Sequence, residues 1–149
     1  QKAGRKIISE MYSPPGVAAE LKNMGHTHLV PGFALYLTVV DPDGGRPWDF
    51  SDCRTQDKAM KTVRTQKPYM IIGSPECTAF VTCIALNEAR SRNPAAIRNA
   101  KANAILHIEF MIRVYYERLE NGRYFLDEHA AYARSWQLGG WWTCWTQQA

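Results

Sequence analysis

The stretch that decides the fold runs from Tyr69 to Phe80 and reads YMIIGSPECTAF. It begins with a short apolar run that stops at Gly73 and Pro75, which is typical of a buried strand in a parallel sheet. In open α/β sheets, ligand-binding and reactive groups gather just past the carboxyl ends of such strands. Cys77 stands in that position, so its thiol is a candidate nucleophile. A cysteine there can also be a buried packing residue, and the pattern leaves both interpretations open.

Strand and helix patterns alternate along the rest of the chain. The expected strands are residues 5–11, 33–40, 69–73 and 124–126. The expected helices are residues 16–24, 54–66, 82–90 and 94–122. Capping signals support the helices. Asn93 and Pro94 form a good N-cap and N1 pair, and Gly25 suits a helix end. Ser51 or Asp52 is placed to cap the helix at residues 54–66. The alternation predicts an α/β domain with an open, mainly parallel sheet and flanking helices.

Composition narrows the class of protein. A chain of 149 residues that is 46% hydrophobic and 21% charged fits one ordinary globular domain. There is no apolar run near 18 residues, so no membrane span is expected. The four cysteines include no C-x-x-C pair, which predicts no metal site and reduced thiols in an intracellular compartment. The net charge of +4 permits a nucleic-acid partner but does not require one.

Polar or turn residues stand at three predicted strand ends, namely Ser13–Gly16, Gly73–Cys77 and Asp127–His129. In this order they resemble the catalytic half of the cytosine-C5 methyltransferases, and more narrowly the methyltransferase-like segments of retroelement-type polyproteins. The resemblance covers about residues 7–138 and implies a partial, Rossmann-like methyltransferase fold. Its most specific part is GSPECTAF at residues 73–80, which is similar to the Pro-Cys loop of that family.

The resemblance implies a site and a mechanism. Cys77 would attack C6 of a flipped-out cytosine. Glu128, which falls where the family has a Glu-Asn pair, would hydrogen-bond the edge of the base. The methyl donor of an active domain would be S-adenosylmethionine. The residues implied for this cofactor lie at strand ends and turns: Ser13, Gly16, Asp41, Asp49, Gly73 and Pro75. Each has a structural alternative, such as an Asx-turn at Asp49 or a solvated turn acid at Glu128.

Several positions depart from the family pattern. Pro14 and Pro15 replace glycines of the cofactor turn and remove backbone donors there. Glu76 places a carboxylate beside the candidate nucleophile, and His129 replaces the asparagine that follows the glutamate. Nothing in the sequence resembles the target-recognition region or the final helix of the family.

These departures lead to three functional hypotheses. The first is a degenerate methyltransferase-like domain that acts as a non-catalytic binding or structural subunit of a larger assembly with protein partners. The second is an active cytosine-C5 methyltransferase half that a partner chain completes. The third is a nucleic-acid-binding module that uses the basic balance and exposed aromatic side chains.

The last segment, residues 139–149, reads GGWWTCWTQQA and differs in composition from everything before it. We therefore divide the chain into a methyltransferase-like domain at residues 1–138 and an aberrant tryptophan-rich tail, which we hypothesise arose by a frameshift. Trp141, Trp142 and Trp145 make this tail a predicted hydrophobic anchor for a protein partner.

Overall fold

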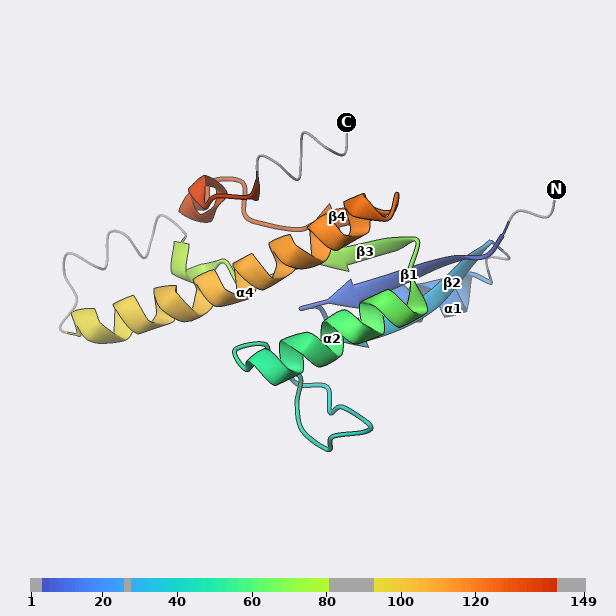
Figure 1. Ribbon diagram of the computed structural model, residues 1–149, viewed down its shortest axis with the longest axis horizontal. Helices are drawn as coiled ribbons and strands as arrows, with labels where there is room; N and C mark the ends of the chain where they lie inside the picture. The colour runs from blue at the N-terminus through green and yellow to red at the C-terminus, as the bar shows by residue number, and fades with distance from the viewer. Residues whose placement is uncertain (1–3, 26–27, 81–92, 142–149) are drawn as a thin grey trace.

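The computed structural model describes residues 4–25, 28–80 and 93–141. At its centre lies a parallel sheet with the strand order β2-β1-β3-β4 (Figure 1). The strands are β1 (Lys6–Met11), β2 (Leu29–Leu35), β3 (Met70–Gly73) and β4 (Tyr124–Asp127). This architecture confirms the predicted open α/β sheet and is Rossmann-like, with the strand order reversing between β1 and β3.

Helices lie on both faces of the sheet. Helix α1 (Gly16–Met24) packs behind β1 and β2, while α2 (Cys53–Gln66) and α4 (Pro94–Glu120) lie in front (Figure 1). The chain passes from β1 to β2 on one side of β1, and it then crosses β1 to reach β3 on the other side. Right-handed crossovers in opposite directions place their helices on opposite faces, which explains this distribution. Two short 3₁₀ helices complete the described elements, η1 (Thr78–Phe80) and η2 (Arg134–Gln137).

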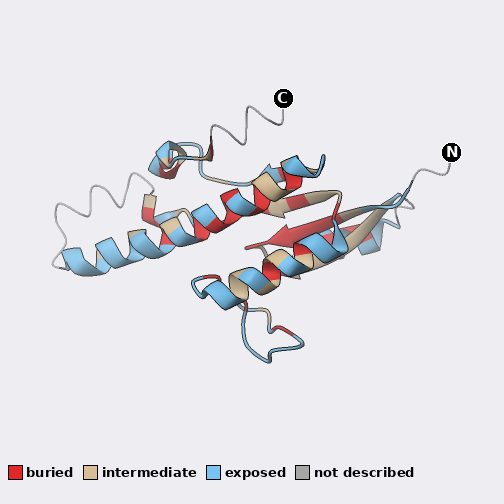
Figure 2. Ribbon diagram, in the orientation of Figure 1, coloured by how far each residue is buried: buried red, intermediate tan, exposed pale blue. Residues whose placement is uncertain are grey.

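The main core lies between the sheet and the two front helices. Buried residues of the sheet, such as Met11 and Ile71, pack there against Val63 of α2 and Tyr115 of α4. Burial is concentrated where α4 crosses the sheet, and the first turns of this helix are exposed (Figure 2). The buried residues of α4 recur at spacings of three and four, so they form one inward face of the helix.

Predicted capping residues end the helices as expected. The side chain of Asp52 accepts a hydrogen bond from Thr55 N at 3.2 Å and so caps α2. Asn93 Oδ1 accepts from Ala96 N at 3.1 Å at the start of α4, directly before Pro94. Such caps satisfy backbone donors that the helix itself leaves without partners.

The second strand lies earlier than predicted, at Leu29–Leu35 instead of residues 33–40. Pro31 and Gly32 indicated a break, but β2 is an edge strand, where proline is tolerated. Gly32 allows a close approach, because a Cβ there would lie 2.1 Å from Ser9 Oγ. The pairing register shifts nearby, between Ile8 and Glu10 of β1. The helix predicted at residues 82–90 lies outside the described residues.

The C-terminal part of the described chain packs into the domain. Trp141 is 2% exposed, and its ring centroid lies 5.1 Å from that of Trp136 and 6.0 Å from that of Tyr115. The packed structure therefore extends beyond the predicted boundary at residue 138. In this chain Trp141 is a core residue, because its indole is enclosed by the domain's own aromatic side chains. Trp142 and Trp145 lie outside the described residues.

No helix in the described part of the chain is both long enough and apolar enough to cross a membrane.

We predict that Gly73→Ala destabilises the domain by about 2 kcal/mol, because an added methyl group overpacks the core. The new Cβ would lie 2.1 Å from Tyr115 Oη and 2.5 Å from Met111 Cε. Gly139→Ala is the matched control, since a Cβ there meets nothing within 4 Å. Urea unfolding of both variants measures the difference, and equal midpoints would contradict the tight packing at Gly73.

Candidate functional site

Three strand ends meet at the carboxyl edge of the sheet. Ser74 N donates to Met11 O at 3.1 Å, which ties the segment after β3 to the end of β1. Glu128 N donates to Gly73 O at 2.8 Å, which ties the end of β4 to β3. The predicted site segments after β1, β3 and β4 therefore lie side by side. This edge includes the point between β1 and β3 where the strand order reverses, the usual ligand position in such sheets.

The carboxylate of Glu10 occupies the N-terminus of α1 at this edge. Glu10 is 1% exposed, and its two oxygens accept hydrogen bonds from Val17 N at 3.1 Å and Ala18 N at 2.7 Å. Ser13 Oγ also donates to Glu10 Oε1, at 3.4 Å. These are backbone donors that a helix N-terminus offers to an anionic ligand. The chain's own carboxylate thus takes the place of such a ligand.

The predicted cofactor residues Ser13 and Gly16 flank this carboxylate. Gly16 is exposed, and a Cβ there would meet only Glu10 Oε1 at 4.0 Å, which is ordinary contact. A side chain would therefore fit at position 16. Sequence reasoning missed Glu10 because it lies within the predicted first strand. The available signal was an acidic residue in an apolar strand directly before a turn and a helix.

Tyr12 and His107 join the end of β1 to α4. Tyr12 has a positive φ of 60°, is 5% exposed, and packs its ring 4.7 Å from that of Phe50. Its hydroxyl lies 2.9 Å from His107 Nδ1. Burial raises the pKa of Tyr12, so the phenol stays protonated and donates this hydrogen bond. Burial also lowers the pKa of His107, against the opposing charges of Asp49 and Glu76. The pair is a neutral link, which sequence reasoning missed.

Asp49 and Asp41 make local contacts within the connection from β2 to α2. Asp49 is exposed, and its Oδ1 accepts from Ser51 N at 3.0 Å and from Ser51 Oγ at 2.6 Å. These bonds lower the pKa of Asp49 and form the Asx-turn that was the structural alternative. Asp41 forms an ion pair with Lys58 of α2. Hydrogen bonding by Lys58 lowers the pKa of Asp41, so its carboxylate is already occupied.

The two predicted catalytic residues follow neighbouring parallel strands. Cys77 is half-buried, stands just before η1, and accepts a backbone hydrogen bond from Phe80 N at 2.9 Å. Pro75 is buried between this cysteine and the end of β3. Glu128 is exposed and follows β4, and its backbone N–H donates a hydrogen bond to Gly73 O. The structure brings both residues to one edge of the sheet, and their catalytic roles remain predictions.

Gly73 itself serves the packing of α4. Its Cα faces Tyr115, whose hydroxyl donates to Asp127 Oδ1 at 2.5 Å. Burial raises the pKa of Asp127 to about 7, opposed by the hydrogen bond from Tyr115 and reinforced by the charge of Glu128. His129 Nε2 lies 2.5 Å from Ser135 Oγ, and burial lowers the pKa of this histidine. Asp127 thus faces α4, and His129 and Ser135 contact each other just beyond β4.

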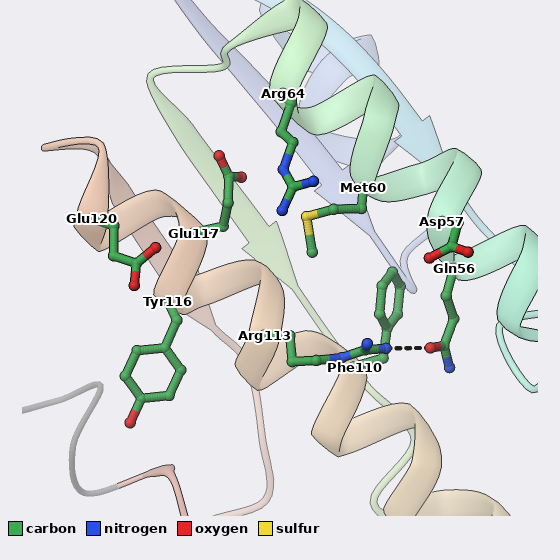
Figure 3. Close-up of a pocket in the computed structure, with 9 residues that line it drawn as sticks. All are labelled: Gln56, Asp57, Met60, Arg64, Phe110, Arg113, Tyr116, Glu117 and Glu120. Carbon is green, nitrogen blue, oxygen red and sulfur yellow. Dashed lines mark hydrogen bonds between the residues drawn. The ribbon is translucent and has the colours of Figure 1, made fainter.

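A cavity of about 290 Å³ lies between α2 and α4 (Figure 3). Met60 and Phe110 supply apolar surface, and Arg113 hydrogen-bonds to Gln56 across the space between the helices. The charged lining is mixed, with Arg64 facing the carboxylates of α4. None of the predicted site residues lines this cavity. Within the described ranges, no three His, Cys, Asp or Glu side chains are grouped to hold a metal ion.

We predict that Glu10→Gln lowers the free energy of unfolding by roughly 1–3 kcal/mol. The amide keeps one acceptor oxygen for the two N–H groups at the start of α1, so one buried donor loses its partner. Glu20→Gln, at an exposed position of the same helix, is the matched control and should be neutral. If chemical denaturation gives the same loss for both variants, Glu10 does not hold the helix terminus.

The raised pKa of Asp127 predicts a pH-dependent stability. Because the folded-state pKa of about 7 exceeds the ordinary value of 3.8, the contribution of Asp127 is complete below pH 3.8 and is lost as the pH rises through 7. Relative to Asp127→Asn, the wild-type protein should lose on the order of 4 kcal/mol between acid and neutral pH. The free energies of unfolding of the wild type and of Asp127→Asn, measured from acid to neutral pH, test this expectation. Asp57→Asn, at an exposed position, is the control, and parallel profiles for wild type and Asp127→Asn would contradict the assignment.

Comparison with known proteins adds no relative. No protein-family model, no curated protein and no solved structure matches this chain. The Rossmann-like architecture thus rests on the strand order and crossovers described above. A function has to be inferred from the side chains at the carboxyl edge of the sheet.

Proposed function

We propose that this chain is a degenerate cytosine-C5 methyltransferase-like domain that serves as a non-catalytic binding or structural subunit of a larger assembly. The observation that carries the proposal is the carboxylate of Glu10 at the N-terminus of α1. A cofactor bound at the strand-order reversal would need the donors that Glu10 already occupies.

The neighbouring residues support the loss of cofactor binding. Tyr12, directly after β1, fills space against Phe50 and is tied to α4 through His107. Pro14 and Pro15 follow and offer no N–H groups. The carboxylates of Asp41 and Asp49 are engaged by Lys58 and Ser51. A bound S-adenosylmethionine would have to displace several of these contacts, each of which stabilises the fold.

One observation favours an active enzyme completed by a partner chain as the second candidate. Cys77 and Glu128 follow neighbouring strands at one edge, and the cysteine is partly open to solvent. In that case the thiolate of Cys77 would bond to C6 of the cytosine while C5 takes the methyl group, and the bond to C6 would break when the C5 proton leaves. Such a step needs S-adenosylmethionine at this edge, so cofactor binding separates the two candidates.

We predict no heat of binding when S-adenosylmethionine is titrated into the full chain, which corresponds to a Kd weaker than about 1 mM. Incubation with a duplex that contains 5-fluorocytosine, together with S-adenosylmethionine, should give no covalent adduct. A micromolar Kd would contradict the loss of the cofactor site. An adduct that disappears in Cys77→Ser would establish catalysis, and Cys53→Ser, at an exposed cysteine, is the control for it. Salt-sensitive DNA binding without cofactor binding would instead favour a nucleic-acid-binding module.

A further inference from the structure

In the described part of the chain, α1 covers its face of the sheet over β1 and β2 and leaves β3 and β4 open. Two rows of paired residues cross this face from β1 through β3 to β4: Ile8–Met70–Tyr124 and Glu10–Ile72–Leu126. The β1 members are 5% and 1% exposed, the β3 members are half-buried, and the β4 members are 46% and 53% exposed. Exposure therefore rises step by step with distance from α1, which contacts β1 and β2.

The hydrogen bonds identify the face unambiguously. Glu10 points toward α1, because its carboxylate binds the first turn of that helix. Its partner Ile72, and Leu126 beyond it, therefore share the α1 face. The alternate residues Gly73 and Asp127 point the other way, toward Tyr115 of α4. Met70, Ile72, Tyr124 and Leu126 thus form one apolar surface, which we call the β3–β4 face.

A parallel sheet is normally covered by helices on both sides, so an open apolar half-face indicates a missing element. Two strands about 4.8 Å apart and four residues long offer a surface roughly 10 Å wide and 13 Å long. That width matches one α-helix, which has a diameter of about 10 Å with its side chains. A single helix therefore fits this surface.

Charges at the two ends of the β3–β4 face agree with a helix in one direction. At the amino end of the strands, Lys6 places Nζ 4.2 Å from the ring centroid of Tyr69, and Arg123 precedes β4. At the carboxyl end, Glu128 is exposed two residues after Leu126. A helix antiparallel to the strands, as α1 is, would bring its positive N-terminus toward Glu128 and its negative C-terminus toward the cations.

We propose that the β3–β4 face binds an amphipathic α-helix of a partner polypeptide, which lies beside α1 and antiparallel to the strands. The apolar side of this helix covers Ile72 and Leu126, and its polar side faces solvent. The inference names a partner class for the binding role proposed above and rests on that role. The two proposals are tested separately, because S-adenosylmethionine binding and helix binding are measured independently and concern different sites.

The first experiment uses a labelled, hydrocarbon-stapled helix of about 14 residues with leucines at i, i+3, i+4 and i+7. Fluorescence anisotropy with the full chain should give saturable, micromolar binding. Leu126→Glu should weaken this binding about tenfold or more, because it places a charge in the centre of the apolar contact. Leu106→Glu is the matched control, since Leu106 is 44% exposed on α4, away from the β3–β4 face, and it should bind as wild type does.

The second experiment raises the effective concentration by fusing the same helix ahead of β1 through a flexible linker. An antiparallel helix ends near the start of β1, so a short linker can span the distance. The fusion should raise the urea midpoint of the full chain, and Leu126→Glu but not Leu106→Glu should abolish the increase. Absence of binding and of stabilisation, or equal effects of the two substitutions, would overturn the proposal. Failure of helix binding alongside an absence of cofactor binding would leave the degenerate domain intact and remove only this partner.

Discussion

The bond between the Glu10 carboxylate and the first turn of α1 is the constraint on which the rest of the structure depends. It anchors α1 to the sheet behind β1, and the next strand, β2, lies beside β1 at the edge of the sheet. The following crossover returns over the front of the sheet, which places α2 and α4 on the other face. The Glu10 carboxylate thus joins the end of β1 to the helix that leads into the edge strand. It also removes the backbone donors that would make this edge attractive to an anionic ligand.

Two pairs of side chains tie the carboxyl edge of the sheet to α4. Tyr12 and His107 link β1 to α4 on one side of β3, and Tyr115 and Asp127 link α4 to β4 on the other. In each pair a phenol donates a hydrogen bond to a buried acceptor. Burial lowers the pKa of His107 and so favours the neutral imidazole, and it raises the pKa of Asp127 and so favours the protonated carboxyl group. Burying an unpaired ion is costly, so neutral pairs of this kind are the less expensive way to fill this edge of the sheet. The result is an edge organised for packing.

The fold could be predicted from the sequence to the extent that local patterns decide it. Asp52, Asn93 and Gly25 marked helix ends correctly, because caps depend on neighbouring backbone groups. The second strand was misplaced because the tolerance of Pro31 depends on which strand lies at the edge, a property of the assembled sheet. The predicted strand-end segments after β1, β3 and β4 do meet, because parallel strands bring their carboxyl ends to one edge of the sheet. Its buried groups Glu10 and His107 were missed, because only tertiary contacts separate them from ordinary strand and helix residues. The tryptophan-rich composition likewise could not tell that Trp141 packs inward.

Gly73 shows how a catalytic-looking motif can persist for a mechanical reason. The glycine lies where Tyr115 presses on β3, and the proline two residues later is itself buried. Selection against misfolding alone would therefore retain much of the GSPECTAF signature, whether or not any reaction occurs beside it. In chains of this type, retention of the glycine and proline is a poor reporter of enzymatic competence. Substitutions at the half-buried cysteine and the exposed glutamate, where side-chain packing matters less, distinguish a catalytic role from a structural one more clearly.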